Sequence, residues 1–111
     1  MGENMAGLRE WIGRTREAAD VITASSLAAM SATLGRDDPP PEPGDPLPAG
    51  WHWLFFHDTT PTAELDEDGH ARRGAFLPPV PLPRRMYAGG RLVFHEPLRV
   101  GEAVRCVSEI A

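Results

Sequence analysis

Four histidines, one cysteine and two pairs of adjacent arginines are the side chains of this chain best suited to chemistry. They are His52, His57, His70, His95, Cys106, Arg72-Arg73 and Arg84-Arg85. Histidine transfers protons near neutral pH, a thiolate can attack an electrophile, and guanidinium groups bind anions through charge-assisted hydrogen bonds. These residue types raise three possibilities: a general base, a nucleophile and an anion site.

The spacing of these residues argues against a metal site and against a nucleophilic cysteine. The histidines and Cys106 are widely spread and lack the compact pairs that are typical of zinc sites. No activating group lies near Cys106 in the sequence, so we expect a small core residue on a strand. A single cysteine also permits no internal disulfide, which favours a reducing, cytoplasmic compartment.

The adjacent residues His57 and Asp58 are the most attractive pair for proton transfer, because an aromatic run precedes them. Neighbouring side chains on an extended chain point in opposite directions, however, so adjacency does not make a dyad. We expect His57 to be a hydrogen-bonded loop residue. His52, between two tryptophans, is predicted to be structural and partly buried, while His70 and His95 are predicted to be exposed.

Charge and composition limit the partners of the chain. The net charge is -5 and no basic stripe is present, which argues against nucleic acid as a partner. No stretch is apolar enough to span a bilayer, so we expect no membrane partner. Half of the 12 prolines lie between positions 39 and 48, which predicts an extended, proline-rich loop over residues 36–50.

Two helices are predicted in the first third of the chain. Residues 24–34 carry apolar positions in helical register, with Thr23 as the N-cap and Gly35 as a left-handed terminator. We expect the alanine-rich face of this helix to pack against a sheet. Residues 5–12 predict a shorter helix, and residues 20–22 a brief extended entry. The aromatic run at residues 51–57 must be largely buried, but its period fits a strand and a short helix equally well.

Two alternating segments near the end of the chain predict an antiparallel pair of strands. Residues 86–95 and residues 104–110 each alternate between two faces, and a Pro-to-Gly turn at residues 96–102 would join them. The sequence stops on the second strand, which would leave unpaired backbone groups and a half-buried apolar face. We therefore expect these residues to be the front half of a larger unit.

Residues 74–94, preceded by the aromatic segment 51–56, closely resemble the N-terminal half of the 3-methylfumaryl-CoA (mesaconyl-C4-CoA) hydratases. These enzymes belong with the type 2 hydroxyacyl-thioester dehydratases, which are relatives of the MaoC-like hydratases. Residues 8–14 and 20–23 also look like that family, so the resemblance spans nearly the whole chain. It implies an α+β hot-dog fold, an antiparallel sheet wrapping a helix, of which residues 1–111 would be an incomplete N-terminal domain.

The resemblance also implies an activity, a substrate and partners. It implies a lyase that adds water reversibly to an enoyl thioester of coenzyme A, with the thioester as substrate and no further cofactor. In relatives the catalytic histidine lies in a second hot-dog unit, so no catalytic residue is carried over to this chain. We expect the missing second half or a partner subunit to complete the enzyme, and a homo-oligomer to form. The alternative is a non-catalytic acyl-CoA-binding or assembly module.

The residues predicted to contact the substrate lie around the second arginine pair. Coenzyme A carries phosphates, and Arg84 and Arg85 follow a stiff proline segment that would hold them in place. The weaker candidates are Arg72 and Arg73 for phosphate and the aromatic cluster Trp51, Trp53, Phe55 and Phe56 for an acyl or pantetheine tunnel, although core packing explains that cluster better. The predicted substrate-binding residues are Arg84, Arg85, Tyr87, Gly89 and Gly90. Room for a crossing helix explains the two glycines better than backbone contact with a thioester does.

Overall fold

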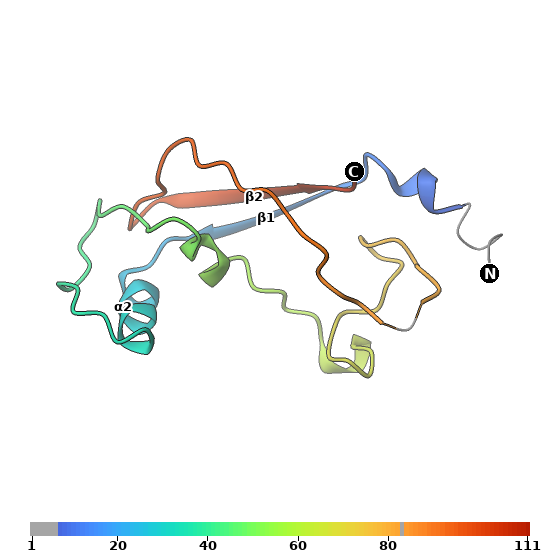
Figure 1. Cartoon of the computed structure of the whole chain (residues 1–111), viewed down its shortest axis with the longest axis horizontal. Coiled ribbons are helices and arrows are strands. Elements are labelled where there is room, and N and C mark those ends of the chain that lie inside the picture. Colours follow the sequence, from blue (N-terminus) through green and yellow to red (C-terminus); the bar gives the residue numbers. More distant parts are fainter. Residues whose placement is uncertain (1–6, 83) are drawn as a thin grey trace. The chain divides into compact units, whose positions relative to one another are not determined.

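The computed structural model describes residues 7–82 and 84–111. Within that part of the chain, one α-helix, two β-strands and three short 3₁₀-helices form, and long irregular segments connect them (Figure 1). This composition confirms the predicted α+β class. In chain order the elements are η1 (Gly7–Trp11), β1 (Thr15–Val21), α2 (Ala24–Thr33), η2 (Trp51–Leu54), η3 (Thr62–Glu64) and β2 (Ala103–Glu109).

The two strands β1 and β2 pair with each other in an antiparallel ladder. At one end the amide of Gly13 donates to the carbonyl of Ile110 at 2.8 Å, and at the other end the amide of Ile22 donates to the carbonyl of Glu102 at 3.0 Å. Residues on β2 alternate between exposed and half-buried positions, as the sequence predicts for this strand. The predicted entry at residues 20–22 is thus the end of a longer strand.

The predicted strand at residues 86–95 is wrong, and so is its pairing with β2. These residues are irregular and exposed, and no backbone hydrogen bond joins them to another segment of the described chain. Met86 is 86% exposed, and Leu92 and Phe94, which were expected to face a core, are 60% and 55% exposed. Alternation gives a segment two different faces, but a strand forms only when a neighbouring strand pairs with it. Here β2 pairs with β1, so residues 86–95 have no strand partner among the described residues.

Helix α2 begins where the sequence predicts and ends one residue earlier, at Thr33, with Leu34 as its C-cap. The hydroxyl oxygen of Thr23 accepts a hydrogen bond from the amide of Ser26 at 3.4 Å, and the same hydroxyl donates to the Ser26 side chain at 2.8 Å. Gly35 follows the helix with a φ of 67°, the left-handed geometry for which glycine is suited. The buried residues of the helix are Leu27 and Ser31 rather than its alanines, so the expected alanine-face packing is corrected.

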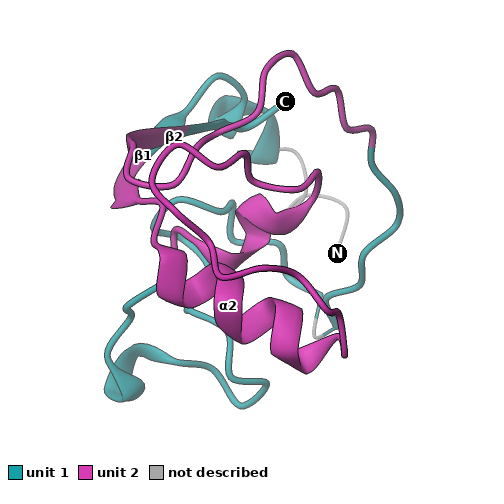
Figure 2. Ribbon diagram, turned by 90° about the vertical axis from the view of Figure 1, so that its left-hand side faces the viewer, with its two compact units in different colours: residues 1–17, 58–90, 107–111 teal, residues 18–57, 91–106 magenta. Residues whose placement is uncertain are grey.

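Two compact units make up the chain (Figure 2). Unit 1 comprises Met1–Glu17, Asp58–Gly90 and Val107–Ala111, and unit 2 comprises Ala18–His57 and Arg91–Cys106. The hydrophobic core of the described residues lies in unit 2. Five segments each contribute one side chain to it, namely the residue after β1, helix α2, the proline-rich loop, the aromatic segment and the turn before β2: Ile22, Leu27, Leu47, Phe55 and Val100.

The proline-rich loop is tied to the turn before β2 by a short run of backbone hydrogen bonds. The amide of Gly44 donates to the carbonyl of Val100 and the amide of Val100 donates to Asp45, both at 2.9 Å. The amide of Leu47 donates to the carbonyl of Leu98 at 2.7 Å. These bonds give an otherwise irregular loop a fixed register and bring Leu47 into the core.

Two further expectations are corrected in detail. The predicted helix at residues 5–12 is the short 3₁₀-helix η1, and residues 5 and 6 lie outside the described part of the chain. The aromatic segment starts with the 3₁₀-helix η2, which resolves the choice between strand and helix. Phe55 is 6% exposed, but Trp53 is 72% exposed, because a turn of helix on a surface cannot bury every side chain.

We predict that Thr23→Ala lowers the free energy of unfolding by about 1 kcal/mol, because the start of α2 loses its side-chain acceptor. Urea unfolding followed by circular dichroism measures the change. The matched control is Ser25→Ala, an exposed position in the same helical turn, for which we expect a change within about 0.5 kcal/mol. Equal effects of the two substitutions would contradict the role of the cap.

Candidate functional site

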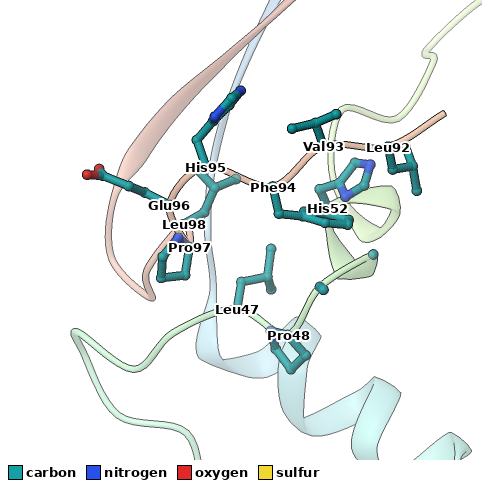
Figure 3. A pocket seen from close by; sticks show the side chains of 12 residues that line it. Leu47, Pro48, His52, Leu92, Val93, Phe94, His95, Glu96, Pro97 and Leu98 are labelled. Atoms are coloured by element: carbon teal, nitrogen blue, oxygen red, sulfur yellow. The ribbon is translucent and has the colours of Figure 1, made fainter.

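An open cleft of about 520 Å³ lies in unit 2, and we call it the leucine cleft (Figure 3). It is bounded by two stretches of chain, residues 47–50 with His52 on one side and residues 92–98 on the other. The bond between Leu47 and Leu98 joins the two stretches at one end of the cleft. Side chains of Leu47, Pro48, Phe94 and Leu98 make its walls predominantly apolar.

His52 belongs to the wall of this cleft. Its ring lies 6.2 Å from the ring of Phe94 in an edge-to-face arrangement and 5.5 Å from that of Trp53. Gly50, which begins η2, has a φ of 87°, so the chain can turn sharply before His52. His52 is half-buried, as predicted, whereas His95 is exposed and its side chain points away from Leu47 (Figure 3).

The leucine cleft suits a slender apolar ligand better than a charged one. Ligand sites in proteins commonly measure about 300–1,000 Å³ and combine apolar walls with a few polar groups. Here the imidazoles of His52 and His95 and the carboxylate of Glu96 are the ionisable groups of the lining. The cleft therefore offers van der Waals contact along its length and hydrogen bonding at few points.

A second cavity, also of about 520 Å³, lies in unit 1, and we call it the arginine cavity. One residue from each sequence-predicted arginine pair lines it, namely Arg72 and Arg85. Arg73 instead donates hydrogen bonds to the backbone carbonyls of Val80, at 2.7 Å, and Leu82. The full lining comprises Arg16, Asp58, Thr60, Leu65, Gly69, His70, Ala71, Arg72, Ala75, Phe76, Leu77 and Arg85.

Arg16 is the member of this cavity that the sequence analysis missed. It lies on β1, and its guanidinium is 4.4 Å from the centre of the Phe76 ring, a cation–π arrangement. No pairing in the sequence marks Arg16. The sequence marks only the partner of Arg16 in this contact, because Phe76 begins the proline-rich stretch that leads to Arg85.

Two carboxylates near the arginine cavity, those of Asp58 and Asp68, accept hydrogen bonds from neighbouring residues. The hydroxyl and amide of Thr60 donate to Asp58 and hold the pKa of that carboxyl below its usual value, with a smaller contribution from Arg16. Nδ1 of His70 lies 3.0 Å from the carboxylate of Asp68, and the hydrogen bonds from the side chain and the amide of His70 lower the pKa of Asp68. His70 is exposed, as predicted.

The prediction that the adjacent residues His57 and Asp58 form no dyad is confirmed, since the carboxylate of Asp58 accepts its hydrogen bonds from Thr60. The nearby carboxylate of Asp20 accepts hydrogen bonds from the amides of Phe56 at 2.9 Å and Val21 at 2.7 Å. Those bonds, that from Phe56 first, lower the pKa of Asp20. Phe56 has a φ of 61°, unusual for a bulky residue, so Asp20 anchors a strained backbone position.

The remaining predicted site residues lie on the exposed segment 84–95. Tyr87 is 83% exposed, and Arg84 is exposed and does not line the arginine cavity. No atom lies within 4 Å of the position that a Cβ would take at Gly89, and at Gly90 the nearest group is the Tyr87 side chain. The crossing helix that could explain the two glycines is therefore not found against them in the described structure.

Other kinds of site have less support in the described residues. No group of three or more histidine, cysteine, aspartate or glutamate side chains is arranged to hold a metal ion among residues 7–82 and 84–111. Cys106 is half-buried on β2. Within the same residues, no helix combines the length and hydropathy that crossing a membrane requires.

Two comparisons with known proteins agree with each other. The sequence profile of the hydroxyacyl-thioester dehydratase type 2 family matches residues 50–111. A mesaconyl-C(4)-CoA hydratase from Chloroflexus aurantiacus is 46% identical to this chain over 95 residues, which cover 86% of the chain and 34% of the relative. The chain thus spans about a third of the length of this curated relative.

We predict that Asp20→Asn lowers stability in a pH-dependent way. The pKa of Asp20 is lower in the folded state than in the unfolded state, so its carboxylate stabilises the fold above about pH 4 and loses this effect as the pH falls through the folded pKa. An asparagine must also place its amide nitrogen against one of the two backbone donors. The urea midpoint of the variant should fall below that of the wild type at about pH 7, and the gap should narrow by about pH 3. A gap that is independent of pH would contradict this assignment.

Proposed function

This chain belongs to the family of type 2 hydroxyacyl-thioester dehydratases, and on that premise we propose that it is the amino-terminal part of an acyl-CoA hydratase. The reaction is the reversible addition of water to an enoyl-CoA, of which mesaconyl-C4-CoA (3-methylfumaryl-CoA) is the favoured example. One observation carries the proposal, the 46% identity to a mesaconyl-C(4)-CoA hydratase over 86% of this chain. A match of that length and identity extends well beyond any single motif.

The proposed role of the chain is to hold the substrate rather than to move protons. Hydration needs a base that activates water, an acid that protonates the α-carbon, and a donor that polarises the thioester carbonyl. The described histidines are spread over separate places: His52 in the cleft wall, His57 near Asp20, His70 paired with Asp68, and His95 at the surface. We propose that polypeptide beyond these residues supplies the acid and base, which agrees with the coverage of 34% of the relative.

The leucine cleft is the proposed place for the acyl and pantetheine portion of the thioester. Its apolar walls match a slender, mostly uncharged chain, and burial of that chain is favoured by about 25 cal/mol per Å² of apolar surface. The exposed side chains of Leu92 and Phe94 would lose apolar surface to water-free contact when the thioester binds. Trp51 and Phe55 serve the core in this arrangement, Phe55 within it and Trp51 packed against it.

Segment 84–90 is the proposed second contact with the substrate. No atom lies within 4 Å of the position that a Cβ would take at Gly89, so a ligand can approach the backbone closely on that side. The proposed contacts are those predicted from the sequence, Arg84, Arg85, Tyr87, Gly89 and Gly90. The second half of the enzyme, or a partner subunit in a homo-oligomer, would cover this segment.

We predict that the protein made from the complete reading frame hydrates mesaconyl-C4-CoA or crotonyl-CoA, while the 111-residue chain alone does not. Loss of the ultraviolet absorbance of the enoyl thioester measures turnover. Turnover by the 111-residue chain alone would contradict the division of roles. Binding without turnover by the complete protein would instead support a non-catalytic acyl-CoA-binding module.

We predict that Leu92→Asp, made in the protein from the complete reading frame, raises the KM for crotonyl-CoA about tenfold or more, because it places a charge in an apolar cleft next to the acyl portion. The matched control is Leu82→Asp, which changes an exposed leucine outside the cleft lining. Thermal unfolding of both variants checks that the fold is kept. Equal KM values for the two variants would remove the leucine cleft from the proposed site.

A further inference from the structure

Three arginines from three separate stretches of sequence meet at one cavity of unit 1. Arg16 comes from β1, Arg72 from the segment after η3, and Arg85 from the segment that follows the proline run. We propose that the arginine cavity binds a phosphate monoester, and that its ligand is the 3′-phosphate at the adenosine end of a CoA thioester. The ligand's identity rests on the function proposed above, while the anion site itself rests on the cavity.

The charge balance of the cavity favours an anion. The whole chain has a net charge of -5, yet the ionisable lining residues are three arginines, one aspartate and one histidine. The aspartate, Asp58, already accepts hydrogen bonds from Thr60. The lining therefore carries an excess of positive charge that its own carboxylate does not balance.

The guanidinium groups also keep donors available. Arg72 reaches the carboxylate of Asp66 only at 3.9 Å, longer than a hydrogen bond. Arg85 influences Asp68 through space, and among the described residues no hydrogen bond joins Arg85 to a carboxylate. Arginine presents five donors in a fixed fork. Three such groups can therefore surround the terminal oxygens of a phosphate monoester dianion.

The form of the cavity fits a phosphate on a larger molecule better than a free ion. Its volume of about 520 Å³ is far more than one phosphate fills, and Leu65, Phe76 and Leu77 contribute apolar surface beside the arginines. An apolar surface next to clustered guanidiniums accommodates a sugar or base carrying the phosphate. Arg16 is held over the Phe76 ring, which fixes the direction from which it approaches a ligand.

Calorimetric titration of the full chain with four probes tests the proposal. The probes are CoA, 3′-dephospho-CoA, adenosine 3′,5′-bisphosphate and inorganic phosphate. We expect CoA and the bisphosphate to bind about tenfold or more tightly than dephospho-CoA, since one charged group makes several charge-assisted bonds. We expect Arg85→Gln and Arg16→Gln each to remove most of this preference, and Arg9→Gln, an exposed arginine of η1 outside the cavity, to retain it.

The preference between two ligands is a ratio measured on one protein sample, so a partly unfolded variant does not imitate its loss. Equal binding of CoA and dephospho-CoA by the wild type, or no binding of CoA, would overturn the proposal. Inorganic phosphate binding as tightly as the bisphosphate would make the cavity a site for free phosphate and would also overturn it. If Arg85→Gln weakened the binding of mesaconyl-CoA but not that of crotonyl-CoA, the arginines would bind the free carboxylate of the mesaconyl group, and this result would also overturn the proposal.

The proposed function and this inference fail separately. If the complete protein hydrates no enoyl-CoA but the wild type still prefers CoA over dephospho-CoA, the phosphate site stands and the hydratase assignment falls. If turnover is found and the preference is absent, the hydratase assignment stands without this site.

Discussion

Ile22 and the turn before β2 form the constraint on which the arrangement of unit 2 depends. Ile22 is 1% exposed, its amide donates to Glu102, and its carbonyl accepts from Gly101. Val100, next to that turn, exchanges hydrogen bonds with the proline-rich loop and so brings Leu47 to the same core. The end of β1, a loop without regular structure and the start of β2 are thereby held by one set of contacts. Because Leu47 and Leu98 belong to both this set and the leucine cleft, the cleft takes its shape from the core.

The features that the sequence predicted correctly are those decided by neighbours in the chain. A threonine cap before α2, a left-handed glycine after it and the alternation of β2 each depend on a few adjacent residues. The hot-dog class was also reached correctly, through a resemblance that the family match now supports, with an antiparallel pair and a helix as its described part. What failed was the choice of partner: residues 86–95 have the pattern of a strand, yet β2 pairs with a segment some ninety positions away, around residues 15–21. Pairing over such a separation is set by tertiary packing, to which a local pattern is blind.

The arginine cavity shows a different limit of reading pairs in a sequence. Arg72 lines the cavity while Arg73 binds backbone carbonyls, and Arg85 lines it while Arg84 does not. Adjacent side chains of an extended chain point to opposite sides, so one member of a pair is available to a given cavity and the other is not. The same rule correctly separated His57 from Asp58, and its application to the arginines would have divided both pairs. Arg16 could not be found in this way, because the topology alone brings β1 to the loop that carries Phe76.

An enzyme can place substrate binding and proton transfer on different parts of its polypeptide, because the binding energy of unreactive groups contributes to catalysis. Contacts with a phosphate or a pantetheine arm far from the double bond can position the thioester and raise the rate of the chemical step. On the proposed function, this chain offers such contacts in two kinds of surface, an apolar cleft and a cluster of guanidiniums. Neither surface needs a catalytic histidine, which agrees with the separate positions of the four histidines. A segment that binds substrate in this way is selected for its shape and charge. Its family is therefore identified from similarity over a long run of sequence rather than from a short catalytic motif.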